Sequence, residues 1–235
     1  MRLGSFYLLL ALLLALASFR FPNAGPILLW VGADFILVGL AYFGLGPSLL
    51  GKRSDGSTAL WSVLLFFPYL FGIDTIWRAR RLLSPTPPFQ ELIPGIFIGR
   101  RLFPREYPAS VDCVVDLTCE LSEFREVRRS QRYLSLPILD GHAPKLADLL
   151  DLIGRIDDIR GTVYVHCAEG YGRTGMIAAA ILLAKGLAHD PDEAIRAVQR
   201  KRPGVHLYRA QHRAVAQVAQ ALTSDTRPHE DHTNR

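Results

Sequence analysis

A thiol, a guanidinium group and three glycines lie within ten residues of this chain, in the segment 166–175 with the sequence HCAEGYGRTG. The β-branched run TVYV at 162–165 precedes this segment, and an apolar run at 176–183 follows it. That order predicts a tight turn between a buried strand and a helix, with Cys167 at the turn. Backbone N–H groups at such a turn attract anions, so the sequence predicts an anion site that contains a nucleophile.

The residue types in this turn predict a cradle for a tetrahedral dianion. Gly170, Gly172 and Gly175 allow the backbone to curl through positive φ values, so that successive N–H groups converge on one point. The residues expected to surround the substrate phosphate are Ala168, Glu169, Gly170, Tyr171, Gly172, Arg173 and Thr174. Arg173 also supplies a planar fork that matches two phosphate oxygens.

The field that attracts phosphate also stabilises a thiolate, which makes Cys167 the candidate nucleophile. Thr174 is expected to support it by donating its hydroxyl to the sulfur. His166 is expected to fix the loop through backbone hydrogen bonds rather than to transfer protons. The predicted chemistry is attack of sulfur on phosphorus, with a phosphocysteine intermediate.

Such a reaction needs an acid that protonates the leaving oxygen and later activates water. Asp140 is the candidate, because it ends an apolar strand and opens the Gly/Pro loop of PILDGHAP at 137–144. The alternative is that Asp140 caps a turn, or the helix expected to start near Lys145. Asp116, in a core strand, is interpreted instead as a structural hydrogen-bond hub.

HCAEGYGRTG matches the HCxxGxxR[ST]G signature at every fixed position and resembles the cysteine-dependent protein tyrosine phosphatase superfamily. The small dual-specificity phosphatases are the most similar branch, on account of IPGIFIG at 93–99, VVDLT at 114–118 and KRPG at 201–204. The resemblance covers residues 89–222, and the spacing from Asp140 to Cys167 is similar to that family's. It implies catalysis without a cofactor or metal, on protein phosphotyrosine, phosphoserine or phosphothreonine.

Residues 89–222 have the pattern of an α/β domain. A short entry strand or hairpin is expected at about 92–98, and strands at about 111–118, 133–138 and 162–167. Helices are expected at about 120–129, 145–160, 174–187, 191–201 and 207–222. Alternation of strands and helices predicts a mostly parallel central sheet flanked by helices, as in the protein tyrosine phosphatases. The polar residues 223–235 are expected to form a disordered tail.

The first 80 residues predict an all-α transmembrane segment of two to three helices. Its apolar stretches lie at about 3–19, 26–50 and 58–77, and about 20 residues are needed to cross the hydrocarbon core. The first stretch is marginal, and its Ala15-Leu16-Ala17 leaves a cleaved signal peptide as the alternative. Asp34, in the second stretch, is expected to face another helix because a carboxylate is costly in lipid.

The basic residues predict the orientation of this membrane segment. Arg78, Arg80 and Arg81 follow the third stretch, whereas the loop before it carries Lys52 and Arg53. The positive-inside rule favours a multi-pass protein with a cytoplasmic catalytic domain. A working thiolate also needs a reducing compartment. The residues 81–88, which include SPTPP, are expected to form a stiff linker that holds the domain close to the bilayer.

Substrate choice is left open by these residues. A phosphorylated protein is the expected substrate, and a lipid phosphate such as a phosphoinositide or phosphatidylglycerophosphate is the alternative; an inactive phospho-binding membrane module is a third. The net charge is +5, but the basic residues are scattered along the chain or lie next to the apolar stretches. This distribution argues against a nucleic-acid partner. Cys113 is interpreted as a core residue, and Cys119 as a candidate for a redox disulfide with Cys167.

Overall fold

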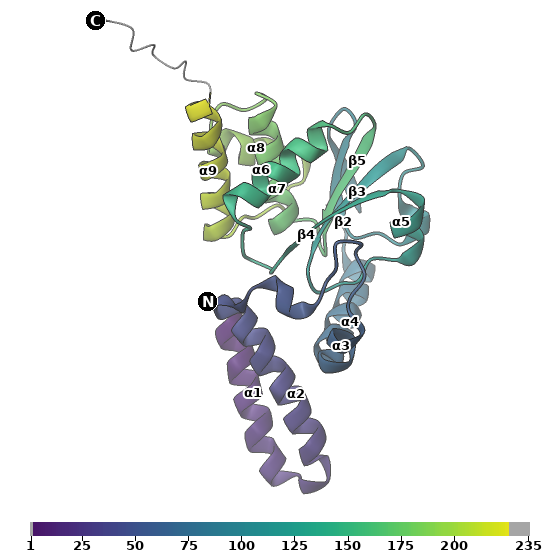
Figure 1. Ribbon diagram of the computed structural model, residues 1–235, viewed down its shortest axis with the longest axis vertical. Helices are drawn as coiled ribbons and strands as arrows, with labels where there is room; N and C mark the ends of the chain where they lie inside the picture. The colour runs from purple at the N-terminus through teal and green to yellow at the C-terminus, as the bar shows by residue number, and fades with distance from the viewer. Residues whose placement is uncertain (1, 226–235) are drawn as a thin grey trace, which may run out of the picture.

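The computed structural model describes residues 2–225, and a five-stranded sheet forms the centre of its catalytic domain (Figure 1). The strands lie in the order β1-β2-β5-β3-β4, and every neighbouring pair is parallel except the antiparallel β1-β2 hairpin. Their bounds are Phe89–Ile93 for β1, Ile96–Arg100 for β2, Val111–Thr118 for β3, Arg132–Ile138 for β4 and Thr162–Cys167 for β5. The predicted α/β class with a mostly parallel sheet is confirmed.

Both faces of the sheet are covered, and strand residues alternate between the two cores. Val163 and Val165 of β5 belong to the larger core, whereas Tyr164 belongs to the smaller one. Side chains alternate because successive residues of a strand point to opposite faces. Figure 1 shows α6, α7, α8 and α9 on one side of the sheet and α5 on the other. Their bounds are Leu146–Asp157 for α6, Gly172–Ala184 for α7, Pro191–Lys201 for α8 and Arg209–Asp225 for α9.

Two predicted helix bounds differ from the structure. The helix expected over 120–129 is α5, and it begins only at Arg125 and ends at Ser130. Residues before it are held by other partners, since the N–H of Glu123 donates to the carbonyl of Gly56 at 2.9 Å. Helix α9 continues to Asp225, three residues into the predicted tail. The rest of that tail, 226–235, lies outside the described residues.

The N-terminal helices α1 (Arg2–Arg20) and α2 (Gly25–Leu40) form a hairpin that extends away from the sheet (Figure 1). Within residues 2–225, two segments are long and apolar enough to cross a membrane, Leu3–Arg20 and Pro22–Leu45. By length and composition alone this is weak evidence. The outer face of the hairpin carries exposed apolar side chains, among them Leu9, Leu12, Leu16, Ile27 and Leu29.

The third apolar stretch is not one continuous helix. It folds as α3 (Leu60–Leu65) and α4 (Phe67–Leu83), which are separated at Phe66. Pro68 stands in the first turn of α4, where a proline is tolerated but a preceding helix is interrupted. Helix α4 packs against the catalytic domain, because Trp77 is 2% exposed and the Arg101 guanidinium lies 4.8 Å from its ring centroid.

Asp34 joins this helix to the hairpin. Its Oδ2 accepts a hydrogen bond from the backbone N–H of Tyr69 at 2.8 Å, in the first turn of α4. The carboxylate therefore caps a helix N-terminus, where the helix dipole favours negative charge. As predicted, Asp34 contacts another helix.

The proline-rich segment is docked on the catalytic domain rather than free. The hydroxyl of Thr86 lies 2.8 Å from that of Tyr171, in the phosphate-binding turn predicted from the sequence. The carbonyl of Pro87 accepts from Arg202 at 2.9 Å, and that of Pro88 accepts from the N–H of Arg100 at 3.0 Å. The segment thus connects the helices to the sheet without separating them.

Candidate active site

Cys167 is the last residue of β5, and the residues after it wrap closely around its sulfur. The backbone N–H of Gly170 donates to Sγ at 3.3 Å, and the side chain is buried. Gly170 has a φ of +75°, and a Cβ there would lie 2.3 Å from the carbonyl carbon of Gly99. No other residue type fits both conditions, so this glycine fixes the turn. Helix α7 begins two residues later, at Gly172.

The other glycines and Thr174 act differently from the prediction. Gly172 and Gly175 lie in α7 and do not take positive φ values. Gly175 is needed for packing, since a Cβ there would lie 2.5 Å from Cγ1 of Val205. The Thr174 hydroxyl donates to the carbonyl of Gly99 at 3.5 Å rather than to the sulfur. Thr174 therefore ties α7 to β2.

Arg173 lies in the first turn of α7, where a glutamate that was not foreseen holds it. Glu120 accepts from Nη2 at 2.7 Å and from Nη1 at 2.9 Å, and the carbonyl of Ile138 accepts from Nη1 at 2.9 Å. Burial acts against both charges, yet their attraction lowers the pKa of Glu120 and raises that of Arg173. The buried Nε of Arg173 has no hydrogen-bond partner among residues 2–225, and Arg173 lines a cavity.

Asp140 follows β4, and its carboxylate lies close to the guanidinium of Arg173. Its Oδ1 lies 3.4 Å from Nη2, and its side chain is 51% exposed. The structure thus brings the three predicted residues, Cys167, Arg173 and Asp140, to one cavity of about 330 Å³. An exposed carboxyl at the mouth of a cavity that contains a buried thiol and guanidinium is suited to exchange protons with a bound ester and with water.

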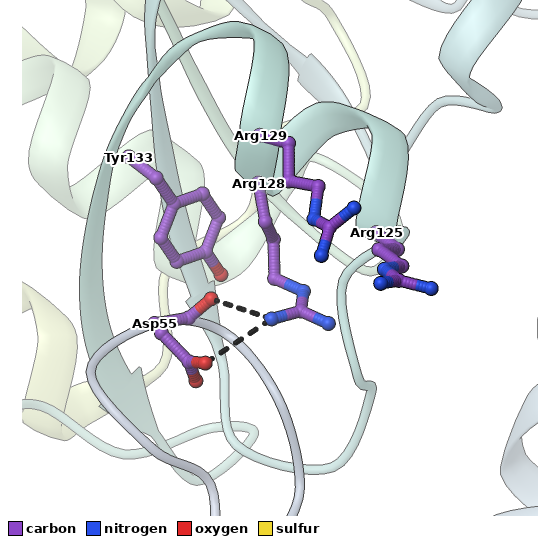
Figure 2. Close-up of a pocket in the computed structure, with 5 residues that line it drawn as sticks. All are labelled: Asp55, Arg125, Arg128, Arg129 and Tyr133. Carbon is purple, nitrogen blue, oxygen red and sulfur yellow. Dashed lines mark hydrogen bonds and ion pairs between the residues drawn. The ribbon is translucent and has the colours of Figure 1, made fainter.

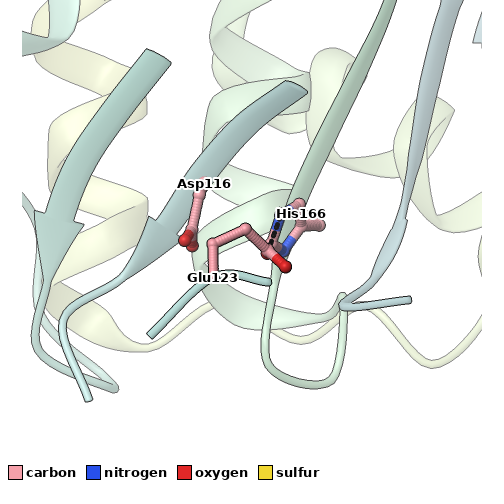
Figure 3. A group of neighbouring side chains, drawn as sticks. All are labelled: Asp116, Glu123 and His166. Carbon is pink, nitrogen blue, oxygen red and sulfur yellow. Dashed lines mark ion pairs between the residues drawn. The ribbon is translucent and has the colours of Figure 1, made fainter. Parts of the chain in front are cut away.

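His166 is fully buried behind this turn, in a cluster with Asp116 and Glu123 (Figure 3). Its Nε2 lies 3.4 Å from Glu123, and its Nδ1 lies 3.4 Å from the carbonyl of Cys167. These contacts fit the structural role predicted for it. The cluster also holds two cations, since Lys52 lies 2.5 Å from Asp116 and Arg101 lies 3.6 Å from Glu123. The two carboxylates are therefore neutralised by protein groups, which leaves little attraction for a divalent ion.

Eight of the nineteen residues that line the cavity come from the N-terminal segment, a contribution that the sequence did not predict. These residues are Leu3 and Tyr7 of α1, Tyr42 from the turn after α2, and Tyr69, Ile73, Ile76, Trp77 and Arg80 of α4. Helices α1 and α4 meet there, since the rings of Tyr7 and Tyr69 pack edge to face with their centroids 5.7 Å apart. We call these residues the helical wall. A ligand in the cavity lies between this wall and the phosphate-binding turn.

Arg202 is a further residue that the sequence did not single out. It lies in the KRPG segment, is buried, and donates to the carbonyls of Gly170 at 2.8 Å and Glu169 at 3.2 Å. These bonds hold the back of the turn, whose Gly170 N–H donates to the sulfur. For Arg202, the only sequence signal is a charged residue between two expected helices, which is a weak signal. For Glu120, which follows Cys119 directly, no spacing in the sequence indicates a role at the site.

All three cysteines are free and buried. Cys119 donates to Glu120 at 3.3 Å, and burial together with that carboxylate raises the pKa of its thiol. A thiol kept protonated is a poor partner for disulfide exchange. The bridge between Cys119 and Cys167 remains an untested prediction, whereas Cys113 lies in the sheet core as expected.

Comparisons with known proteins place this geometry among phosphatases. Residues 108–187 match the family model described as "Polymorphic toxin system, DSP-PTPase phosphatase", and no protein with a curated function matches the sequence. Tk-PTP in its active form is similar with a TM-score of 0.53 at 26% identity, over 57% of this chain and 97% of its own.

Two further solved structures share the fold. PTPMT1 in complex with PI(5)P has a TM-score of 0.54 at 19% identity, over 60% of this chain and 100% of its own. A mouse dual specificity phosphatase complexed with zinc tungstate has a TM-score of 0.50 at 21% identity, over 60% and 93%. The similarity covers about three fifths of this chain.

Proposed function

Since its catalytic domain belongs to the cysteine-dependent protein tyrosine phosphatase superfamily, we propose that this chain hydrolyses the phosphomonoester of a lipid at a membrane surface. The phosphatase assignment rests on the family match and on the fold. The lipid assignment rests on the helical wall, through which the apolar N-terminal helices contribute to the cavity that contains Cys167.

The proposed mechanism has two steps. The Cys167 thiolate attacks phosphorus while Asp140 gives its proton to the leaving alkoxide, which departs as an alcohol. Arg173 and the turn amides hold the equatorial oxygens of the transferring phosphoryl group. Asp140, now a carboxylate, takes a proton from water, whose oxygen attacks phosphorus and releases the thiolate and inorganic phosphate.

The position of the cavity supports a lipid substrate. The end of the α1-α2 hairpin that carries the start of α1 is the end nearest the sheet (Figure 1). Leu3 lies at the start of α1, and Tyr42 lies in the turn that follows α2. If the exposed apolar faces of the hairpin are covered by hydrocarbon, this end lies at the bilayer surface, where lipid phosphates are found. A lipid whose phosphate occupies the turn would then place its glycerol and first acyl carbons against the helical wall.

The protein substrate expected from the resemblance fits the cavity less well. A phosphopeptide needs an open rim on which its backbone can lie, whereas here Tyr7, Tyr42 and Ile73 occupy one side. The inactive binding module is disfavoured for another reason. Cys167, Arg173 and Asp140 are all present and line the same cavity, and a module that only binds would not need the cysteine.

A phosphate-release panel tests the substrate class with the full chain. We expect a higher kcat/KM for phosphatidylglycerophosphate or a phosphoinositide in vesicles than for phosphopeptides. Ile73→Ser should lower kcat/KM for the vesicle lipid about tenfold more than for p-nitrophenyl phosphate, because it removes apolar contact with the acyl region alone. Leu82→Ser, an exposed residue of α4 outside the cavity, is the matched control.

Two results would overturn the proposal. Faster turnover of phosphopeptides than of every vesicle lipid would return the chain to the protein phosphatases. Phosphate binding without release from any of the esters would favour the binding module.

Glu169 should tune the affinity of the cavity for phosphate. Burial raises the pKa of this carboxyl, and Arg80, 3.9 Å away, opposes the shift only in part. Its negative charge at the lip repels the substrate dianion, so Glu169→Gln should lower KM about fivefold, equivalent to about 1 kcal/mol. The group is charged only above its pKa, so the effect should be full at alkaline pH and shrink as pH falls through that value.

The KM ratio of wild type to Glu169→Gln, measured across pH with p-nitrophenyl phosphate, checks this prediction. Titration of the substrate affects both proteins equally and cancels in the ratio. Asp151→Asn, an exposed change on α6, serves as control. A ratio that does not vary with pH would show that the charge of Glu169 does not act on the substrate.

A further inference from the structure

A loop between the apolar helices inserts into the catalytic domain. Residues 51–59 form a small hairpin closed by a bridge between Lys52 and Thr58. A Cβ on Gly56 would lie 2.5 Å from the ring of Tyr133, so the loop is pressed against β4. Figure 2 shows Asp55 of this loop facing Arg128 of α5, which donates to its carboxylate at 3.2 Å beside a basic hollow.

Lys52 is the part of this loop that reaches deepest. Its side chain is 0% exposed, and its ammonium donates to Oδ2 of Asp116 at 2.5 Å, to Oγ1 of Thr118 at 2.9 Å and to the carbonyl of Leu121 at 2.5 Å. All three of its donors are therefore used. Burial alone would raise the pKa of Asp116, but Lys52 holds it well below its usual range. In the sequence analysis Lys52 contributes only to the comparison of basic residues that predicts the membrane orientation. That role does not require its side chain to be buried.

The partners of Lys52 bracket the residue that holds Arg173. Thr118 and Leu121 lie on either side of Glu120, and both are bonded to the same ammonium. Glu120 in turn makes the two-point ion pair with Arg173. A chain of direct contacts thus runs from the membrane-proximal loop to the phosphate-binding guanidinium.

The apolar contacts of the same region follow this route. One core cluster combines Val38, Leu50 and Phe66 of the N-terminal segment with Cys119 and Leu139 of the catalytic domain. Cys119 precedes Glu120, and Leu139 precedes Asp140. Two segments of the catalytic domain therefore pack on the N-terminal segment. One carries Glu120, which holds Arg173, and the other carries the candidate acid Asp140.

We propose that Lys52 is a positioning residue for Arg173, so that the phosphate site is complete only when the apolar N-terminal third is docked. This rests on the proposed function only in that the site binds a phosphate group. Lys52 touches no reacting atom. It fixes the backbone from Thr118 to Leu121, and through Glu120 it sets the angle of the guanidinium fork.

A purely structural role would consist of neutralising Asp116. Removing Lys52 alone leaves a buried, unpaired carboxylate and is expected to lower stability. The double variant Lys52→Met/Asp116→Asn removes both charges and should recover most of the lost Tm. If Lys52 positions Arg173, this folded variant still binds oxyanions poorly, because Thr118 and Leu121 have lost their shared donor.

The experiment uses the full chain and measures vanadate affinity by calorimetry, with p-nitrophenyl phosphate turnover in parallel. Lys52→Met and the double variant should bind vanadate about 10- to 100-fold more weakly and lose a similar factor in kcat/KM. Arg53→Met, the exposed neighbour on the same loop, is the matched control and should match wild type. The combination Lys52→Met/Glu120→Gln should bind vanadate no more weakly than Glu120→Gln alone, because Lys52 acts through Glu120.

Wild-type vanadate affinity in the folded double variant would overturn the proposal. Additive losses in Lys52→Met/Glu120→Gln would also overturn it, because Lys52 would then act by another route. Failure of the proposed function has a different signature. There the wild-type chain releases no phosphate from any ester, while the comparison of vanadate affinities still decides the role of Lys52.

Discussion

Phosphate release should fall at least about 10⁴-fold when Cys167 is replaced by serine. A serine hydroxyl at this position is almost fully protonated, and the N–H of Gly170, which donates to the atom there, stabilises an anion but takes no proton. The turn itself needs no change to accept the oxygen, because the serine side chain is smaller. Binding of phosphate or tungstate should therefore stay close to wild type.

Turnover of p-nitrophenyl phosphate and oxyanion titration of the same preparation measure the two effects separately. Cys113→Ala, in the sheet core, is the control for thiol loss without loss of the nucleophile. A single-turnover experiment on wild type, stopped with acid, should trap phosphate on the protein, and the Cys167→Ser protein should trap none. Residual turnover within tenfold of wild type would remove Cys167 from the mechanism.

Arg173→Lys should lower kcat about 10²- to 10³-fold although the charge is kept. The guanidinium fork holds Glu120 with two nitrogens, bonds the carbonyl of Ile138, and keeps Nε for the substrate. One ammonium cannot occupy these positions at once. It will pair with Glu120, the nearest buried carboxylate, so the oxygens of the transferring phosphoryl group lose their planar partner.

A loss of stability accompanies this change and must be separated from the catalytic effect. Glu120 is buried and would be only partly paired by lysine, which lowers Tm. Adding Glu120→Gln removes the charge and should recover Tm without recovering kcat. Arg200→Lys, an exposed change on α8, is the control. Recovery of activity together with Tm would show that Arg173 serves the fold alone.

The arginines after the third apolar stretch show that the catalytic domain is packed against the apolar segment and not merely tethered to it. Arg81 lies 4.5 Å from the ring of Phe103, and Arg80 approaches Glu169 in the phosphate-binding turn. The sequence favours a role for these residues as topology anchors, and in the structure they also join α4 to the catalytic domain. The cytoplasmic orientation that their charges favour stays a prediction. Helix α4 is therefore part of the active-site wall as well as part of the apolar segment.

Features that depend on neighbours along the chain could be predicted from the local sequence pattern. Thr162–Cys167 became a strand and Gly172–Ala184 a helix because their local patterns agree with those elements. The cradle followed from the order strand, glycine turn, helix. Local pattern also placed Asp140 at a strand end, and the parallel sheet then brought this end beside Cys167, because parallel strands present their carboxyl ends at one edge.

The residues that hold and surround that cradle are brought together by long-range packing. Glu120 lies 53 residues from Arg173, and Lys52 lies 64 residues from Asp116. Pairings at such separations are set by packing, and no periodicity in the sequence encodes them. The third apolar stretch divides at Phe66, just before Pro68, and its second helix buries Tyr69 and Trp77 against the hairpin and the catalytic domain. Composition could reveal that the first third is apolar, but its place in the active-site wall depended on which faces the folded domain left open.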